Sequence, residues 1–315
     1  MFFLLRALVL VLGVVVDHVF GDPDTRFHPV AVLGSLVSVW GVPAYYIHHS
    51  RLVQRFIGVF FWICTVFLFT LPYALFEWYA SFLLYLIGAP FLFSSCMALS
   101  GLLAHVHAVL DAQNIEMMRK NAQHLVSRST SEFTQEQALS ATLESASENL
   151  TDSIIAPLFY FCLFGLPGMA LYRAANTMDA MLGYRDEREN LGWCAARADD
   201  VLSYIPARIT GMFLMLYFWC MKRGKEALAV YHADHNKRPG YNGGIPISLI
   251  AGGVGVQFEK PGVYVIGIQE RMLSDATNAI LQTLVMVTVA FVLCAIFILI
   301  ALEWRASSGI MYMLS

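Results

Sequence analysis

Residues 56–76 read FIGVFFWICTVFLFTLPYALF, a run that contains no charged side chain. Its length matches the ~20 apolar residues that a helix needs to cross the ~30 Å hydrocarbon core of a bilayer. Two other segments, Trp78–Leu103 and Ala276–Leu302, are longer still and contain no Lys or Arg. The sequence therefore predicts an integral membrane protein, with the lipid bilayer as its environment.

The composition of the whole chain agrees with this prediction. Its 315 residues are 58% hydrophobic and 14% charged, and the mean hydropathy is +0.61, whereas about a quarter of the residues of soluble domains are charged. Phe2–Val16 is shorter, and we expect a retained helix there because no small-residue cleavage site follows it. Ile154–Ala175 and Ile205–Met221 are apolar but interrupted by Pro, Gly or Arg. These two could form broken spans, re-entrant pieces or interfacial helices.

Basic side chains predict the orientation of the chain, because cytoplasmic loops carry the excess of Lys and Arg. The turn between the first two runs holds only Glu77, whereas the other ends of those runs are flanked by Arg51, Arg55, Arg119, Lys120 and Arg128. We therefore expect a hairpin that enters from the cytoplasm and returns to it.

The predicted fold is an all-α polytopic protein of the cell inner (plasma) membrane, with about 4–6 membrane-embedded segments. We expect residues 1–315 to form one membrane-embedded domain. Its larger polar segments, 104–152 and 222–271, are expected to form a helical region that faces the cytoplasm together with the active site. No arginine-rich aromatic surface is visible in the sequence, so no nucleic-acid partner is expected.

A helix with an acidic stripe is predicted in the polar middle of the chain. Thr134 and Gln137 have the spacing of a capping box, which marks the start of a helix. On that helix Glu144, Glu148 and Asp152 are four residues apart, so their carboxylates should share one face. A bound cation would relieve their mutual repulsion, although a solvated acidic face has the same pattern.

A second polar cluster consists of Arg173, Asn176 and Asp179, spaced three residues apart. Asn and Asp are poor residues for the middle of a helix because their side chains compete for backbone hydrogen bonds. The cluster therefore indicates a ligand or metal site, or else a helix cap near Asn176.

A third cluster, Arg197-Ala198-Asp199-Asp200, has Arg208 two helical turns after Asp200. Carboxylates bind hard cations through oxygen, and guanidinium groups bind phosphate with two parallel hydrogen bonds. The pattern suits a Mg²⁺ nucleotide, and a structural ion pair between Asp200 and one of the two arginines is the alternative.

Two loops carry residues suited to catalysis or phosphate binding. Gly21-Asp22-Pro23 and His28 place an acid and an imidazole directly after the first helix. Asn242-Gly243-Gly244 is a glycine-rich loop whose backbone can approach a phosphate closely. The sequence contains neither a P-loop nor a dinucleotide-binding fingerprint, so any nucleotide site is of an uncommon kind.

These motifs occur in an order that resembles a known enzyme family. The matching residues are Gly21-Asp22-Pro23 with His28-Pro29-Val30, Glu148-Asn149-xx-Asp152 with Ile155–Tyr160, Asn176-Thr177-Met178-Asp179 with Gly183-Tyr184, Ala196–Val201 with Tyr204–Arg208, and Asn242-Gly243-Gly244 with Gly262-xxx-Ile266-Gly267. The set resembles the adenosylcobinamide-phosphate synthase family of cobalamin biosynthesis over most of the chain. The sequence departs from the family pattern at Ala31, Ser153, Ser203 and Gly243, where many members have Arg, Gly, Asn and Ala.

The resemblance implies an ATP-dependent ligase that acts in adenosylcobalamin (vitamin B12) biosynthesis. It would join a side-chain carboxylate of adenosylcobyric acid to 1-aminopropan-2-ol phosphate or ethanolamine phosphate, giving adenosylcobinamide phosphate. Mg²⁺, ATP and a corrinoid substrate are implied, and other membrane enzymes of cobalamin assembly are candidate partners. A carboxylate is a poor acceptor at neutral pH, so the expected route is phosphorylation to an acyl phosphate followed by attack of the amine.

The resemblance also suggests a role for each polar residue. Those expected to hold Mg²⁺ or to orient the amine are Glu148, Asp152, Asp179, Asp199 and Asp200. Those expected to be catalytic are Asp22, His28, Glu148, Asp152, Asp179 and Asp200. Those expected to bind phosphate or substrate are Asn149, Arg173, Asn176, Arg197, Arg208, Asn242 and Gly243.

Two other classes of protein fit part of the pattern. A non-catalytic membrane sensor on the same scaffold should show erosion of the acidic motifs, which are intact here. A transporter would explain broken apolar segments near charged groups, but no paired halves of similar hydropathy are visible.

Overall fold

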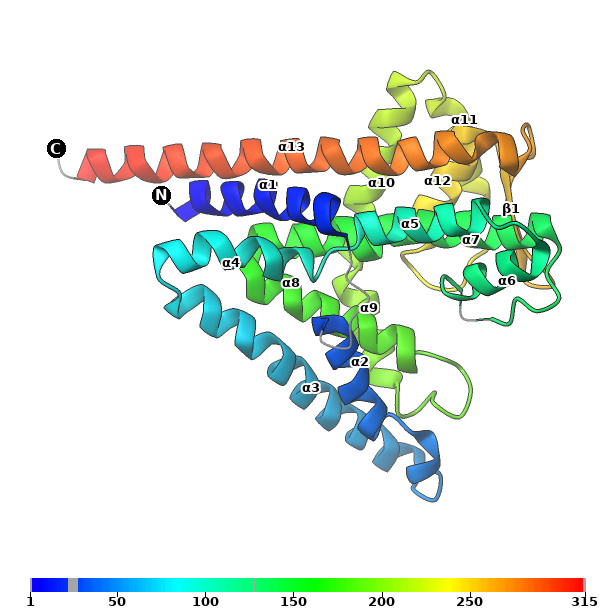
Figure 1. The fold of residues 1–315 in the computed structure, drawn as a ribbon, viewed down its shortest axis with the longest axis horizontal. Helices are drawn as coiled ribbons and strands as arrows, with labels where there is room; N and C mark the ends of the chain where they lie inside the picture. The colour runs from blue at the N-terminus through cyan, green and yellow to red at the C-terminus, as the bar shows by residue number, and fades with distance from the viewer. Residues whose placement is uncertain (1, 22–27, 127, 314–315) are drawn as a thin grey trace. The chain divides into compact units, whose positions relative to one another are not determined.

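The computed structural model describes residues 2–21, 28–126 and 128–313, and within them the regular secondary structure is helical apart from one β-hairpin (Figure 1). The helical stretches of this part that are long and apolar enough to cross a membrane are Phe3–Phe20, Arg51–Tyr79, Phe82–Leu110, Gln135–Leu182 and Leu273–Ser308. The helix pair Trp193–Leu202 and Tyr204–Cys220 adds one more if the two form a single span. The prediction of an all-α polytopic membrane protein is confirmed.

The chain forms two compact units, the first made of residues 1–98, 156–202 and 292–315 and the second of residues 99–155 and 203–291. The prediction that the whole chain is one membrane-embedded domain stays a prediction. The first unit contains α1 (Phe2–Phe20), α2 (Pro29–Trp40), η1 (Pro43–Tyr45), α3 (Arg51–Tyr79), α4 (Phe82–Ser94), α8 (Ala156–Leu182), α9 (Trp193–Leu202) and the end of α13 (Leu273–Met313).

Within the first unit, α3 lies along α8 and α1 lies beside α4 (Figure 1). The Ser50 side chain caps α3 by accepting a hydrogen bond from the Val53 N–H at 3.4 Å. The second predicted span begins later than the sequence suggested. Trp78 ends up in α3, and the next helix starts at Phe82 after the N-cap residue Ser81.

Helix α8 is broken near its middle. Gly165 has φ +70° and ψ −155°, a conformation that glycine adopts without a steric penalty. Pro167 follows, and a proline disfavours helical geometry in the residue before it. The predicted interruption of this segment is confirmed, although the break falls at Gly165. Pro157 instead lies in the first turn of α8, where a missing N–H is tolerated.

Two buried charged side chains satisfy the backbone at this break. The Leu166 N–H donates to Glu77 Oε2 at 2.6 Å, and Arg6 Nη1 donates to the Leu163 carbonyl at 3.2 Å. Arg6 Nη2 lies 3.3 Å from Glu77 Oε1, and the two side chains are 10% and 11% exposed. The carboxylate is thus at the N-terminus of the second half of α8 and the guanidinium at the C-terminus of the first half. Both charges are favourable for the helix dipoles.

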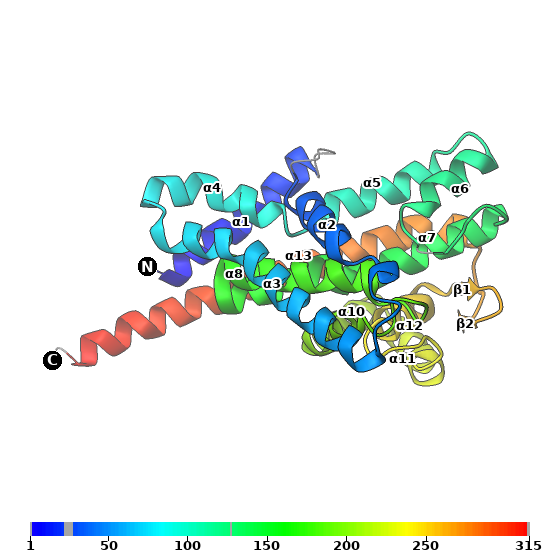
Figure 2. The same ribbon diagram turned by 90° about the horizontal axis from the view of Figure 1, so that it is seen from below.

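The second unit holds the polar segments. Its elements are α5 (Leu99–Leu110), α6 (Ile115–Gln123), α7 (Gln135–Asn149), η2 (Leu150–Ile155), α10 (Tyr204–Cys220), α11 (Gly224–Asp234), α12 (Gly244–Val254), β1 (Gln257–Lys260), β2 (Tyr264–Gly267) and the start of α13. Helix α12 is buried along its whole length and packs against α7, α10 and α11 (Figure 2). Gly252 permits this packing, since a Cβ there would lie 2.6 Å from the Glu226 carbonyl oxygen of α11. The hairpin pairs Gln257 with Gly267, and β1 packs on α7.

Helix α7 begins as predicted. Thr134 Oγ1 accepts a hydrogen bond from the Gln137 N–H at 3.2 Å, and Gln137 Oε1 accepts one from the Thr134 N–H at 3.0 Å. The following element, η2, is π-helical and contains Asp152. A π-helical turn holds more residues than an α-helical turn, so a spacing of four residues keeps Asp152 close to the face of Glu148, and both carboxylates raise the pKa of Arg238. The prediction that Glu144, Glu148 and Asp152 share one face stays a prediction.

Candidate functional site

The motifs singled out in the sequence gather into two clusters, one in each unit. In the second unit, Glu148 of α7 lies close to Gly243, and Arg208 of α10 binds Asn242. In the first unit, polar side chains of α8 and α9 meet. Each cluster therefore joins motifs that are far apart along the chain.

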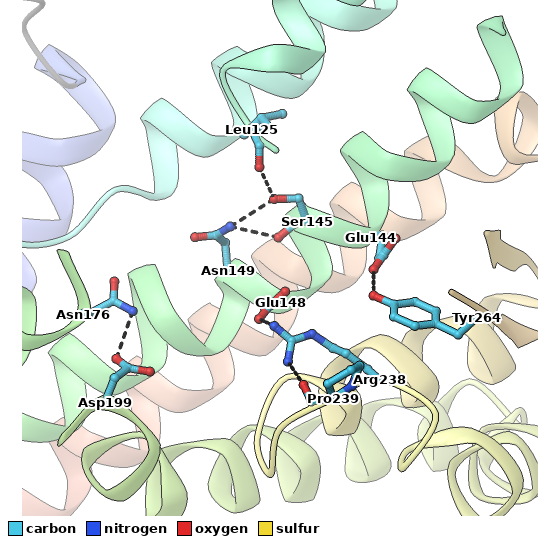
Figure 3. A network of polar contacts seen from close by, with 10 residues as sticks. All are labelled: Leu125, Glu144, Ser145, Glu148, Asn149, Asn176, Asp199, Arg238, Pro239 and Tyr264. Carbon is cyan, nitrogen blue, oxygen red and sulfur yellow. Dashed lines mark hydrogen bonds and ion pairs between the residues drawn. The ribbon is translucent and has the colours of Figure 1, made fainter. Parts of the chain in front are cut away.

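Glu148 forms an ion pair with Arg238, a residue that the sequence motifs did not indicate. Arg238 Nη2 donates to Glu148 Oε1, and Arg238 Nη1 donates to the Pro239 carbonyl at 2.8 Å (Figure 3). Burial lowers the pKa of Arg238, but the Glu148 carboxylate raises it, and the result lies above the ordinary value. The guanidinium therefore stays charged beside the carboxylate.

The glycine-rich loop approaches this ion pair closely. A Cβ on Gly243 would lie 2.7 Å from Glu148 Oε1 and 2.7 Å from Arg238 Cζ. Glycine at this position leaves room for the Glu148–Arg238 pair. The loop makes the close approach that its glycines predict, and its neighbour here is an ion pair.

Glu144, one turn before Glu148 on α7, binds Tyr264 of β2. The Tyr264 hydroxyl donates to Glu144 Oε1 (Figure 3), and Glu144 is only 7% exposed. Burial and then the charge of Glu144 raise the pKa of Tyr264 well above its usual range. The phenol therefore remains protonated and keeps donating its hydrogen bond to the carboxylate.

A cleft of about 240 Å³ opens beside these two carboxylates within the second unit. It is lined by Leu125, Val126, Arg128, Ala141, Glu144, Ser145, Glu148, Arg238, Pro239, Lys260 and Tyr264. The sequence motifs indicated only Glu144 and Glu148 among its charged side chains. The other charged residues come from distant segments without a shared local pattern, so only the fold brings them together.

Asn149 is the last residue of α7, and Asp152 lies in the following element, η2. Asn149 Nδ2 donates to the Ser145 carbonyl at 2.9 Å, and Asn149 Oδ1 accepts from Ser153 Oγ at 2.7 Å. Asn149 is thus held by its own helix and orients Ser145 beside the cleft (Figure 3). Asp152 is half-buried in the π-helical segment.

Arg208 and Asn242 form a further polar contact of the second unit. Arg208 Nη1 donates to Asn242 Oδ1 at 2.7 Å and to the Tyr204 carbonyl at 3.0 Å. Its guanidinium carbon also lies 3.5 Å from the centre of the Tyr204 ring. These contacts fix the start of the glycine-rich loop on α10.

In the first unit, Asn176 of α8 meets Asp199 of α9. Asn176 Nδ2 donates to Asp199 Oδ1 at 3.2 Å (Figure 3). Both side chains are half-buried, so they are fixed by packing and still reach solvent. The contact joins two of the predicted polar clusters, and Asn176 lies inside α8 rather than at its cap.

Most of the other predicted residues of the first unit lie on α8 and α9, within a few positions of Asn176 or Asp199. Arg197 Nη1 lies 3.4 Å from Asp200 Oδ2, and the Arg197 side chain is 59% exposed. An exposed pair of this kind contributes only about 0–1 kcal/mol, so it leaves Arg197 able to turn toward a ligand. Arg173 and Asp179 are half-buried on α8. His28 is half-buried at the N-cap of α2, whereas Asp22 lies outside the described residues.

The carboxylates expected to bind Mg²⁺ are divided between the two units. Glu148 and Asp152 belong to the second unit, and Asp179, Asp199 and Asp200 to the first. Across the described ranges, no three His, Cys, Asp or Glu side chains form a ready-made metal cage. Mg²⁺ that arrives with a nucleotide needs only one or two protein carboxylates, because phosphates and water supply the other oxygen ligands. The oxygen donors of either cluster fit that requirement.

Comparisons with known proteins identify the family. The family model described as CobD/Cbib protein matches residues 10–292. A "Probable cobalamin biosynthesis protein CobD" of Methanothermobacter thermautotrophicus is 37% identical over 90% of this chain and 95% of its own length. The "Cobalamin biosynthesis protein CobD" of Dehalococcoides mccartyi is 36% identical over 86% of this chain and 89% of its own length.

A third relative, from Methanococcus aeolicus, bears the same name as the Methanothermobacter protein and is 33% identical over 94% of this chain. No solved structure matches the chain. Matches of this extent support a role in cobalamin biosynthesis, and this chain belongs to the CobD/CbiB family.

Proposed function

We propose that this protein is an ATP-dependent ligase that joins adenosylcobyric acid to 1-aminopropan-2-ol phosphate, or to ethanolamine phosphate, and forms adenosylcobinamide phosphate. The observation that carries the proposal is the contact between Glu148, Arg238 and Gly243. It joins two motifs of the family resemblance, and the paired side chains are 90 positions apart in the sequence. The names of the relatives support the biosynthetic role.

The proposed reaction has two steps. A carboxylate oxygen of adenosylcobyric acid attacks the γ-phosphorus of ATP, and ADP leaves. The amine nitrogen then attacks the acyl carbon, phosphate leaves with the former carboxylate oxygen, and the nitrogen loses a proton as the amide forms. Positioning of the reactants and neutralisation of phosphate charge supply most of the rate enhancement in such reactions.

Within this proposal the first-unit cluster binds the nucleotide. Asp199 and Asp179 supply carboxylate oxygens, and Arg197 and Arg173 supply guanidinium groups for phosphate. When bound, Mg²⁺ would neutralise charge on the phosphates of ATP. Asn176 holds Asp199 in place through the hydrogen bond at 3.2 Å.

Turnover by the purified protein is the direct test. We expect full-length protein in detergent, given adenosylcobyric acid, Mg-ATP and either aminoalcohol phosphate, to release ADP and the amide product in equal amounts. Liquid chromatography with mass spectrometry measures both. Product formation without ATP, or ATP hydrolysis that does not depend on the amine and yields no amide, would contradict the proposed reaction. The product yields with the two amines identify the preferred substrate.

The proposed location is the inner (plasma) membrane, with the polar segments 104–152 and 222–271 and the active site facing the cytoplasm and other membrane enzymes of cobalamin assembly as partners. The support for this orientation is the basic residues around the first two predicted spans. Glu136 and Lys237 are exposed in the second unit, so both positions can report on sidedness.

Single cysteines at Glu136 and Lys237 test the orientation in a background without the six native cysteines. We expect an impermeant thiol reagent to label both only after the membrane is opened, because intact cells present the opposite face. Labelling at a position engineered into the turn near Glu77 provides the matched control and should occur in intact cells. Labelling of position 136 or 237 from outside would overturn the orientation.

A further inference from the structure

The cleft of the second unit combines both signs of charge in a small volume. Its walls hold the cations Arg128, Arg238 and Lys260 and the carboxylates Glu144 and Glu148. The cations outnumber the carboxylates by one, so the cleft as a whole has one excess positive charge. A ligand that matches it must carry both signs and a net negative charge.

The internal contacts of the cleft leave two of its cations available. Glu148 is paired with Arg238, and Glu144 accepts a hydrogen bond from Tyr264. Arg128 lies over the Phe133 ring at 5.1 Å. Lys260 lies over the Tyr264 ring at 5.6 Å. Neither of these two makes an ion pair with another residue in the described part of the chain, so both can bind an anion without losing a partner.

The size of the cleft limits the ligand further. Pockets for drug-sized ligands usually have volumes of about 300–1,000 Å³, and this cleft has about 240 Å³. A corrin macrocycle is too large for it. A nucleotide triphosphate is unfavourable for another reason, because its polyanionic tail would lie against Glu144 and Glu148 and be repelled by them.

We infer that this cleft binds the aminoalkyl phosphate substrate as a zwitterion, with the phosphate on Arg128 and Lys260 and the ammonium on the Glu144–Glu148 side. The inference rests on the proposed function for the identity of the amine. A phosphate monoester carries about −1.5 to −2 charges at neutral pH, and the ammonium carries one positive charge. The net charge of the ligand therefore complements that of the cleft.

Calorimetric titration of the full-length protein in detergent, without ATP or corrinoid, tests the inference. The ligands are 1-aminopropan-2-ol phosphate, isopropyl phosphate, which lacks the amine, and 1-aminopropan-2-ol, which lacks the phosphate. We expect the zwitterion to bind at least about tenfold more tightly than either truncated ligand, because each loses its charge-assisted contacts. Equal affinity for the zwitterion and a truncated ligand would overturn the inference.

Matched lysine variants test the position of the phosphate. Lys260→Met removes the cation but keeps the length of the side chain, and it should weaken zwitterion binding by about tenfold or more. Lys225→Met alters an exposed lysine of α11 outside the cleft and should leave the affinity unchanged. An unchanged affinity in Lys260→Met would overturn the assignment.

A carboxylate variant tests the position of the ammonium. In Glu148→Gln we expect the preference for the zwitterion over isopropyl phosphate to disappear while isopropyl phosphate still binds. If Glu148 has only a structural role, the variant should bind both ligands more weakly by the same factor, and that result would overturn the inference. If the parent protein forms the amide but binds both ligands equally, the proposed function stands and this assignment falls. If it binds the zwitterion selectively but forms no amide, the assignment of this cleft stands and the proposed function falls.

Discussion

Glu148→Gln should reduce kcat/KM for the aminoalcohol phosphate by about a hundredfold or more, as expected when one preorganised charged group is removed from an active site. The substitution keeps the size of the side chain but removes the charge that holds Arg238. Arg238 would then be free to leave its position against Gly243. Amide formation at fixed Mg-ATP, measured over a range of amine concentrations, gives the required ratio.

The matched control for this variant is Glu136→Gln. Glu136 lies in the first turn of the same helix, is exposed and does not line the cleft. Its variant should keep the parent kinetics, because neither ligand binding nor the Glu148–Arg238 pair involves it. If Glu148→Gln keeps the kcat/KM of the parent, the prediction is wrong, and the Glu148–Arg238 pair only stabilises the fold.

Glu77→Gln should lower the stability of the protein by about 3–5 kcal/mol, the usual effect of removing one partner of a buried ion pair. The substitution leaves the Arg6 guanidinium buried next to a neutral amide and weakens the hydrogen bond accepted from the Leu166 N–H. Temperature-induced loss of monodisperse protein in detergent, followed by size-exclusion chromatography, should therefore begin at a clearly lower temperature. The double variant Arg6→Met, Glu77→Gln should regain part of the loss, since no uncompensated charge remains and the new amide oxygen can still accept from the Leu166 N–H.

Asp186→Asn is the control for this second prediction. Asp186 pairs with Arg188 at 2.5 Å, but the two side chains are 45% and 31% exposed. Hydrogen bonding to Arg188 lowers the pKa of Asp186 to about 2, so this pair is fully ionised at neutral pH. Exposed pairs contribute little to stability, and the variant should unfold at the parent temperature. An equal shift in both variants would mean that burial does not decide the effect.

Local sequence patterns predicted the helical elements well. The capping box at Thr134 fixes the start of α7, because both of its hydrogen bonds involve residues three positions apart. Apolar length predicted the candidate spans near Phe56–Phe76, Trp78–Leu103 and Ala276–Leu302, and it left Ile154–Ala175 and Ile205–Met221 open. The break in α8 was expected at Pro157, Pro167 and Gly168 but occurs at Gly165. Pro167 restricts Leu166, the residue directly before it, and Gly165, one position earlier, adopts the positive φ that glycine tolerates.

The partners of the predicted site residues could not be read in the same way. Arg238 and Tyr264 meet Glu148 and Glu144 across 90 and 120 positions of sequence. A single arginine in a polar loop has no periodicity that separates it from other surface arginines. The available signal was the glycine at position 243. A glycine in a loop can indicate that another group lies too close for a Cβ, and here that group is the Arg238 side chain.

The contacts at the break in α8 bear on how the chain enters the membrane during synthesis. Arg6 and Glu77 both precede Gly165 in the sequence, so both leave the ribosome before the segment that contains the break. An unsatisfied N–H or carbonyl is costly in hydrocarbon, yet here the carboxylate and guanidinium that satisfy them are already present when the segment arrives. Helices α1 and α3 thus supply the hydrogen-bond partners that the broken helix α8 needs when it inserts. Insertion of α8 then depends on two residues that lie 89 and 157 positions before their partners in it.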